Sequence, residues 1–485
     1  MTKLNLVISL FICGLVLIAG SAAFAEDAEN QQDNAQKLKD RIDPAVKKAC
    51  EFLKNTQLGD GSWDYLDQPF ELNLPGVEGH LVEGCTALCV YTLLKGGESP
   101  KSPAVQKAVA FMRSRPFKHV YSVACYVLAL SALYTTDSHK AEDKEISSEE
   151  KIRTTIQDDP AADFRKKAAP QDKKMVIDAV DWLVKNQQAN VWRYPQHGED
   201  TSNTQYVMLA FNEAQRLGIP IPISSCLKTA QFFVKHQEES GPEVEWFPVP
   251  AADVSIRNLR KLEKEIRKEI GKIEKELKKD KDKERADGLT TSVLEDARDK
   301  IFSGEKKKMF ARGWCYMPID PANQEWRKEI TGSMTTSGII SLTVCKSVLE
   351  GTPEYSADFS VKVDQAIRDG CAWIAHKFTV TTNPTKSGDR FLHHYYYLYG
   401  LERAGALTLV FSFGTHNWYK EGAELILSQQ QDDGSWIALG GGTSGPIPDT
   451  CFAILFLKKA TTPIVNVPET PTTGGDLFND PKDKK

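Results

Sequence analysis

Two closely similar segments near opposite ends of the chain constrain its fold more than any other feature. The segment ACEFLKNTQLGDGSW ends at Trp63, and the segment GAELILSQQQDDGSW ends at Trp436. In both, an apolar helical stripe leads to a glutamine, to a glycine four residues later, and then to Ser-Trp. Weaker copies between them end at Trp192 and Trp246. Repetition of this kind indicates a fold built from repeated structural units.

Amphipathic and almost wholly apolar helical segments alternate along the chain. The first kind has apolar residues at helical spacing, as at Val46, Ala49 and Leu53, whereas segments such as CTALCVYTLL lack a polar face. A helix without a polar face has to be buried on nearly all sides, so these helices form an inner layer. The sequence therefore predicts an all-α fold, an α6/α6 toroid with two concentric layers of six helices. The expected pairs are 44–57 with 81–95, 104–113 with 119–134, 174–188 with 203–217, 224–237 with 332–349, 361–377 with 390–405, and 417–431 with 449–459.

The repeated tryptophan turn has a structural interpretation. Gly61 and Gly434 are expected to end their outer helices in a left-handed turn, which favours glycine. Trp63 and Trp436 then lie back over the neighbouring repeat and bury ~150–250 Å² each. The glutamine side chain can bond the helix-end carbonyls that have no helical partner. We expect these turns to stabilise the ring.

The N-terminus has the pattern of a signal peptide. Lys3 precedes the apolar stretch LVISLFICGLVLIAG, and an A-x-A cleavage site lies directly before Glu26. We expect residues 1–25 to be removed and the mature chain to be exported to the periplasm or the extracellular space. A retained N-terminal membrane anchor is the alternative. No other stretch approaches the ~20 apolar residues of a transmembrane helix.

Polar segments flank and interrupt the predicted ring, which spans residues 43–460. Residues 26–42 form a polar leader, and residues 461–485 are expected to be a disordered tail. The ring has charged insertions at 137–172 and 251–308. In the second insertion, two apolar stripes among Lys and Glu predict a charged antiparallel helical hairpin. This hairpin, at residues 256–303, is either a solvated decoration, a docking arm for a protein partner, or a lid over the ring.

Composition limits the classes of partner and chemistry. The net charge of −5 provides no basic field that would attract nucleic acid. Signal-peptide cleavage would leave nine cysteines, most of them inside apolar helical segments. We expect buried thiols and at most one disulfide. The sequence has no P-loop, dinucleotide-binding glycine pattern, H-E-x-x-H or G-x-S-x-G element.

The Gln-x-x-x-Gly-x-Trp units and the six helix pairs resemble the superfamily of squalene/terpenoid cyclases and protein prenyltransferase β subunits. The resemblance covers roughly residues 43–460, and its strongest motifs lie at 49–63 and 422–436. It implies the α/α toroid fold. It does not by itself imply a reaction, because one fold supports several functions.

The motif that protonates the substrate in squalene–hopene-type cyclases is incomplete in this chain. Those enzymes carry D-x-D-D-T-A at the start of an inner helix, and the nearest match is Asp200-Thr201-Ser202-Asn203-Thr204. The position of the protonating aspartate holds Ser202, which is not a strong acid. The resemblance therefore predicts no conventional protonating cyclase chemistry.

The zinc site of the prenyltransferases is also only partly matched. Val82-Glu83-Gly84-Cys85 resembles their V-D-G-C segment, with Glu83 in place of aspartate. Cysteine and carboxylate are suitable zinc ligands, but the late histidine of the family is missing. We expect no cofactor, with zinc at Glu83 and Cys85 as an alternative to a buried core thiol at Cys85.

In this superfamily the inner helices run parallel, and their N-termini surround one mouth of the ring. Helix N-termini offer unpaired N–H groups and partial positive charge, which suit an anion or a carboxylate. Three carboxylates at or near inner-helix starts are candidate acids or bases: Asp200, Asp449 and Glu83.

Aromatic residues at the same helix starts are candidate ligand-binding residues, because aromatic faces stack on isoprenoids, sterol-like molecules and sugars. Ordinary inner-layer packing is the alternative. His393 and His394 are adjacent and point to different faces, so we expect at most one to reach the centre. The candidates are Tyr121, Tyr206, Trp314, Tyr316, His394, Tyr395 and Tyr396.

Three functions follow from these patterns. The leading hypothesis is an exported, cyclase-like protein that binds or handles an apolar, isoprenoid-like or polycyclic ligand in a central cavity. The second is a protein-interaction scaffold that uses the charged hairpin. The third is an exported toroid enzyme, either similar to a zinc prenyltransferase or acting on polysaccharide through paired carboxylates.

Overall fold

The structure of the chain is a computed structural model that is mostly helical, which confirms the all-α prediction. The predicted signal peptide, most of the predicted hairpin and most of the predicted tail lie outside the described residues. No helix in the described segments is long and apolar enough to cross a membrane. The structure describes residues 24–64, 80–135, 160–194, 198–266, 268, 306–319, 324–390, 392–438 and 445–466.

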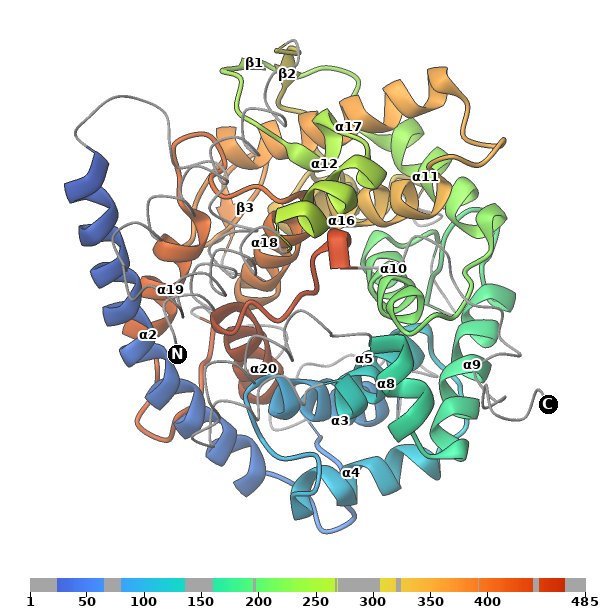
Figure 1. The fold of residues 1–485 in the computed structure, drawn as a ribbon, viewed down its shortest axis with the longest axis vertical. Helices are drawn as coiled ribbons and strands as arrows, with labels where there is room; N and C mark the ends of the chain where they lie inside the picture. Colours follow the sequence, from blue (N-terminus) through green and yellow to red (C-terminus); the bar gives the residue numbers. More distant parts are fainter. Residues whose placement is uncertain are drawn as a thin grey trace.

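Six helices are buried on almost every side and contact one another in a closed order. All residues at 122–133, in the second of these helices, are buried. α3 packs against α5, α5 against α10, α10 against α16, α16 against α18, α18 against α20, and α20 against α3. Figure 1 shows the six around the middle of the molecule. They are α3 (His80–Lys95), α5 (Val120–Thr135), α10 (Thr201–Arg216), α16 (Gly332–Leu349), α18 (His394–Thr408) and α20 (Pro446–Leu457).

Six further helices lie at the periphery in Figure 1, and one of them, α17, is buried throughout residues 366–374. In α4 the buried residues Val105, Ala108, Val109 and Met112 follow the spacing of a single helical stripe. Each of the six precedes one of the buried helices in the chain, as the sequence predicts. They are α2 (Phe24–Asn55), α4 (Pro103–Arg113), α9 (Pro170–Lys185), α11 (Ile223–His236), α17 (Ala357–His376) and α19 (Trp418–Ser428).

The glutamine of each repeat connects two peripheral helices. Gln57 Nε2 donates to the carbonyls of Gly61 and Ala104, both at 2.9 Å, so the end of α2 is joined to α4. Gln430 Nε2 donates to the carbonyls of Gly434 and Ala45, at 3.0 and 2.8 Å, and joins the end of α19 to α2. The last peripheral helix is thereby bonded to the first. Gly61 and Gly434 have the expected left-handed conformation, with φ angles of 91° and 95°. They do not end the helices as predicted, because α2 already ends at Asn55 and α19 at Ser428.

The tryptophan of each repeat is fixed by two hydrogen bonds. Trp63 Nε1 donates to the Leu53 carbonyl of α2 at 2.6 Å, and its backbone N–H donates to Thr86 Oγ1 of α3 at 3.0 Å. The indole therefore ties a peripheral helix to the buried helix that follows it. The same pair of bonds occurs at Trp192 with Leu183 and Thr204, at Trp314 with Phe233 and Thr335, and at Trp436 with Ile426 and Thr450.

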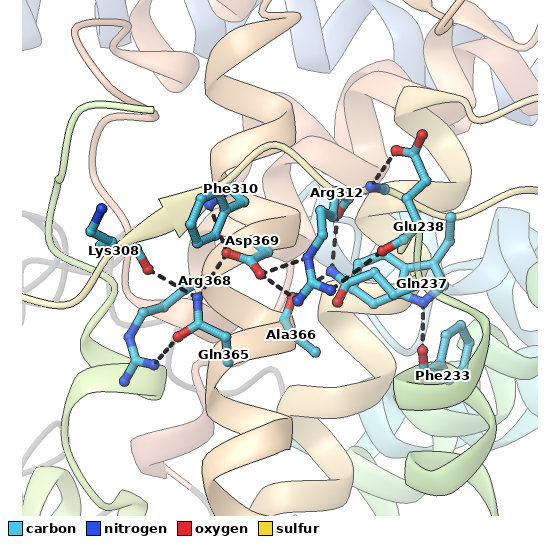
Figure 2. Close-up of polar contacts among 12 residues, drawn as sticks. Phe233, Gln237, Glu238, Lys308, Phe310, Arg312, Gln365, Ala366, Arg368 and Asp369 are labelled. Atoms are coloured by element: carbon cyan, nitrogen blue, oxygen red, sulfur yellow. Dashed lines mark hydrogen bonds and ion pairs between the residues drawn. The ribbon is translucent and has the colours of Figure 1, made fainter. Parts of the chain in front are cut away.

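One repeat differs from the sequence prediction. The repeat that begins at Gln237 has Trp314 as its tryptophan, so the prediction of Trp246 is incorrect. Gln237 Nε2 donates to the carbonyls of Arg312 and Ala366, both at 2.9 Å (Figure 2). A long insertion enters between the glutamine and the tryptophan of this turn. Its two ends meet in a short antiparallel pair, β1 (Glu243–Val244) with β2 (Met309–Phe310).

Parts of the predicted leader, insertions and tail are ordered where they contain apolar residues. α2 extends back to Phe24 and buries Leu38 and Ile42 of the predicted leader. Phe164 is buried in the predicted first insertion, and Ile464 and Val465 are buried in the predicted tail. The remaining elements are α8 (Pro160–Lys167), α12 (Pro250–Asp253), α15 (Glu325–Lys328), the pair β3 (Asn383–Pro384) with β4 (Asp389–Arg390), and the 3₁₀ helix η1 (Ile464–Asn466).

Candidate functional site

Three tyrosines from different buried helices meet near the helix starts. The ring centroids of Tyr121 and Tyr206 are 4.1 Å apart, and those of Tyr206 and Tyr396 are 6.3 Å apart. Each residue lies in the first two turns of its helix, so α5, α10 and α18 begin at the same end of the molecule. Glu213 and Ser131, near the ends of α10 and α5, meet at the other end through a 2.7 Å hydrogen bond.

The buried guanidinium of Arg403, two turns further along α18 than Tyr396, is surrounded by aromatic faces. Its Cζ lies 4.1 Å from the ring centroid of Tyr399, 5.0 Å from that of Tyr206 and 5.9 Å from that of Tyr396. Such cation–π contacts are strongest where water is excluded. We call Tyr121, Tyr206, Tyr396 and Tyr399 the tyrosine cluster. Arg403 occupies the middle of this cluster as an internal cation.

The buried carboxylate of Asp200 lies at the start of α10, next to this cluster. Its Oδ1 accepts hydrogen bonds from the Asn203 backbone N–H at 2.6 Å and from Ser202 Oγ at 2.7 Å, which makes it the N-cap of the helix. Burial raises the pKa of Asp200, and the bond from Ser202 partly offsets this rise. Burial also raises the pKa of Tyr316 well above its usual range, and the Asp200 charge adds to this effect.

Side chains at this end are enclosed by protein and yet remain accessible. Burial raises the pKa values of Tyr121 and Tyr396 well above the usual range and lowers the pKa of His393 to about 4. All three side chains nevertheless keep solvent-accessible surface. We call the end of the molecule that carries Tyr121, Tyr396 and His393 the mouth.

His393 was missed by the sequence analysis, which instead selected its neighbour His394. The ring of His393 lies 6.2 Å from the Tyr396 ring in an edge-to-face arrangement, whereas His394 is buried and bonds the Val380 carbonyl through Nε2 at 2.7 Å. His393 has a φ of 60°, an unusual left-handed conformation for a residue other than glycine. The sequence signal for this residue is the pair His393-His394, but two adjacent histidines do not reveal which imidazole ring faces the tyrosine cluster.

Two other predicted ligand-binding aromatics have structural contacts. Tyr395 is buried, and its hydroxyl donates to Gln429 Oε1 of the peripheral layer at 2.9 Å. Trp314 is the tryptophan of a repeat turn, and its ring packs on Gly338 of α16. Neither residue contributes a ring to the tyrosine cluster. Of the predicted aromatics, the structure brings together Tyr121, Tyr206 and Tyr396, and it places Tyr316 beside Asp200.

The three candidate carboxylates lie in separate surroundings. Asp449 Oδ2 accepts the Ala438 N–H at 2.9 Å, and burial raises the pKa of Asp449 to about 7. Burial also raises the pKa of Glu83, and nearby Lys118 partly offsets this rise. Neither Asp200 nor Asp449 is among the groups that shift the pKa of Glu83.

Of the predicted zinc ligands Glu83 and Cys85, the thiol of Cys85 lies in a group of buried thiols. Cys85 is buried near Cys89, whose Sγ lies 3.7 Å from Cys451 Sγ and so connects α3 with α20. In the described segments, no group of three or more His, Cys, Asp or Glu side chains is arranged to hold a metal ion. All nine cysteines of the described segments are free and buried.

Comparison with known proteins adds no relative. No protein-family model matches the chain, and a search of curated proteins finds no matching sequence.

The raised pKa of Asp449 predicts a pH dependence of stability. The folded state binds a proton at Asp449 more tightly than the unfolded state, so stability falls as pH rises from about 4 to about 7. Asp449→Asn cannot ionise, and it keeps an oxygen for the Ala438 N–H. The free energy of unfolding of this variant minus that of the native chain should increase by about 1–3 kcal/mol from pH 4.5 to pH 8. Urea unfolding of both proteins at the two pH values measures this difference. The same difference at both pH values would contradict the raised pKa of Asp449.

Proposed function

We propose that the chain is an α6/α6 toroid with six parallel inner helices. The closed order of contacts among α3, α5, α10, α16, α18 and α20 supports this architecture. The hydrogen bond from Gln430 to Ala45, which joins the last peripheral helix to the first, gives independent support. In this arrangement the mouth lies where the inner helices begin, and residues 460–466 cover the opposite end through contacts such as Thr461 with Glu402.

We propose that the protein binds a predominantly apolar, isoprenoid-like ligand at the mouth. The observation that carries this proposal is the presence of enclosed but accessible rings at Tyr121 and Tyr396. Apolar ligands bind in concave sites lined by aromatic side chains with a few polar groups. Asp200, Tyr316 and His393 supply such groups at this end. His393 is neutral at pH 7 because its pKa is lowered to about 4, so it does not repel or attract a charged ligand.

Conventional cyclase chemistry is not part of this proposal. Ser202 stands at the protonating position, and its hydroxyl donates a hydrogen bond to Asp200. The aromatic faces that would stabilise a carbocation already contact the guanidinium of Arg403. A second positive charge in the same cluster would be repelled by the first. We therefore propose binding or handling of the ligand rather than its cyclisation, in a chain exported through residues 1–25.

The other two functions receive less support. Action on polysaccharide requires paired carboxylates, and the candidates Asp200, Asp449 and Glu83 occupy separate surroundings. A scaffold role depends on the predicted hairpin at 256–303, most of which lies outside the described residues. No contact of the described residues favours either function over ligand binding.

The test is the affinity for farnesol, a C15 isoprenoid alcohol. Native mass spectrometry of the full chain should detect one bound farnesol, and Tyr396→Leu should weaken binding about 5- to 10-fold through loss of the aromatic face. Tyr355→Leu is the matched control, because Tyr355 is also half-buried but lies beyond the other end of α16. Absence of a farnesol complex, or equal weakening by both substitutions, would argue against the mouth as a ligand site.

A further inference from the structure

The buried guanidinium of Arg403 has two terminal nitrogens to which the described residues offer no hydrogen-bond acceptor. Its Nε donates to the Tyr399 carbonyl of the same helix at 3.2 Å, which fixes the orientation of the guanidinium. Nη1 and Nη2 are buried and make no hydrogen bond with the part of the chain that the structure describes. The side chain forms no ion pair with the residues that the structure describes. The two nitrogens that chelate a carboxylate in Arg–carboxylate pairs are therefore left without a partner.

No carboxylate of the described residues forms an ion pair with Arg403. The nearest groups are tyrosines, and burial raises the pKa values of Tyr206 and Tyr399, so both stay neutral at physiological pH. Burial raises the pKa of Cys125 as well, so this thiol is also uncharged. Glu402 directly precedes Arg403 in α18. Its carboxylate accepts hydrogen bonds from the Thr461 N–H at 3.1 Å and from the Thr461 hydroxyl at 2.7 Å.

A buried charge without a counter-ion is costly, and cation–π contacts compensate for only part of the lost hydration. Two other buried guanidinium groups of the described residues have carboxylate partners: Arg368 pairs with Asp253 at 2.7 Å, and Arg216 pairs with Glu213 at 2.6 Å. Arg403 differs from them in this respect.

We propose that the ligand of the mouth is an apolar monocarboxylic acid, whose carboxylate pairs with Nη1 and Nη2 of Arg403. This inference rests on the proposed function and adds the polar group of the ligand. One guanidinium balances one negative charge, whereas a diphosphate would bury further unpaired charge. Tyr396 belongs to the mouth, its ring centroid lies 5.9 Å from Cζ of Arg403, and its hydroxyl accepts a hydrogen bond from Gln205 Nε2. Rotation of the Tyr396 ring away from Gln205 admits the carboxylate, while the apolar body stays against Tyr121.

Farnesoic acid and farnesol form a matched pair of probes, because they share a chain and differ in the carboxylate. By calorimetry at pH 7.5, the native full-length chain should bind the acid about 10- to 100-fold more tightly than the alcohol, as expected for a charged hydrogen-bonded pair. Arg403→Gln should reduce the affinity for the acid to that for the alcohol and leave the affinity for the alcohol within about 3-fold. Arg403→Lys keeps the charge without the planar fork and should restore only part of the preference.

A second measurement does not depend on the folding of a variant. Carbon-13 NMR of carboxyl-labelled farnesoic acid bound to the native chain should show a carboxyl pKa at least about one unit below that of the free acid. Equal affinities for acid and alcohol, or an unshifted carboxyl pKa, would overturn the carboxylate pairing and leave the proposed function intact. Failure of both probes to bind would reject the proposed function, and the carboxylate pairing would fall with it.

Discussion

Trp436→Ala is expected to lower the free energy of unfolding by about 3–5 kcal/mol, the usual cost of removing a buried tryptophan side chain. The indole is fully buried, and its Nε1 donates to the Ile426 carbonyl at 2.7 Å. Its loss leaves a cavity and a carbonyl without its partner at the junction between the last and the first repeat. Urea unfolding of the full chain, followed by circular dichroism, measures the effect.

The matched control is Trp326→Ala, which removes a tryptophan that is 54% exposed. This change should cost less than about 1 kcal/mol. Gln430→Ala probes the same junction without a large cavity and should cost about 1–2 kcal/mol, because it removes the hydrogen bonds to Ala45 and Gly434. If Trp436→Ala were no more destabilising than Trp326→Ala, the repeat turn would not stabilise the ring.

The helix pairs were predictable because amphipathic and apolar periodicities are local properties of a sequence. The tryptophan of the fourth turn was not predictable, because Trp246 follows Gln237 at a plausible distance and Trp314 follows only after a long insertion. The criterion that separates them is spatial. Trp314 bonds the end of α11 and Thr335 of α16, whereas Trp246 is half-buried beneath the ammonium group of Lys306.

The candidate site was predictable only in part. The predicted starts of the inner helices identified Asp200, Tyr121, Tyr206 and Tyr396, and in the structure α5, α10 and α18 begin at the same end of the molecule. Arg403 was missed since it lies deeper in its helix, although a charged residue in the apolar segment YGLERAGAL is itself a signal. A charge in a helix without a polar face has to be buried, and such charges mark functional or paired positions.

Adjacent residues at a helix start cannot be assigned to a face from sequence. His393 and His394 differ by one position, and the left-handed conformation of His393 changes the direction in which its ring leaves the backbone. Sequence periodicity assumes helical geometry, which begins only at His394. The error therefore arises from the non-helical residue at the helix cap rather than from the helix itself.

The buried carboxylate of Asp369 in α17 gives the second large prediction, because it holds the returning end of the long insertion against the ring. It accepts the Phe310 N–H at 2.8 Å and the Gln365 amide at 2.9 Å, and it receives Arg312 Nε and Nη2 at 2.8 and 2.5 Å (Figure 2). Arg312 also supplies the carbonyl that Gln237 bonds in the fourth turn. Asp369 thus supports both strand β2 and the repeat turn.

Asp369→Ala should lower the free energy of unfolding by about 3–5 kcal/mol, because it leaves the guanidinium of Arg312 without its carboxylate and the Phe310 N–H without its acceptor. Glu243→Ala is the control: it removes an exposed ion pair with Lys308 on the same strand pair and should cost less than about 1 kcal/mol. The double variant Asp369→Ala/Arg312→Ala should be less destabilised than the sum of the two single variants, because the second change removes the unpaired charge that the first creates. Strict additivity in urea unfolding, or a cost for Asp369→Ala no greater than that for Glu243→Ala, would show that the network does not anchor the insertion.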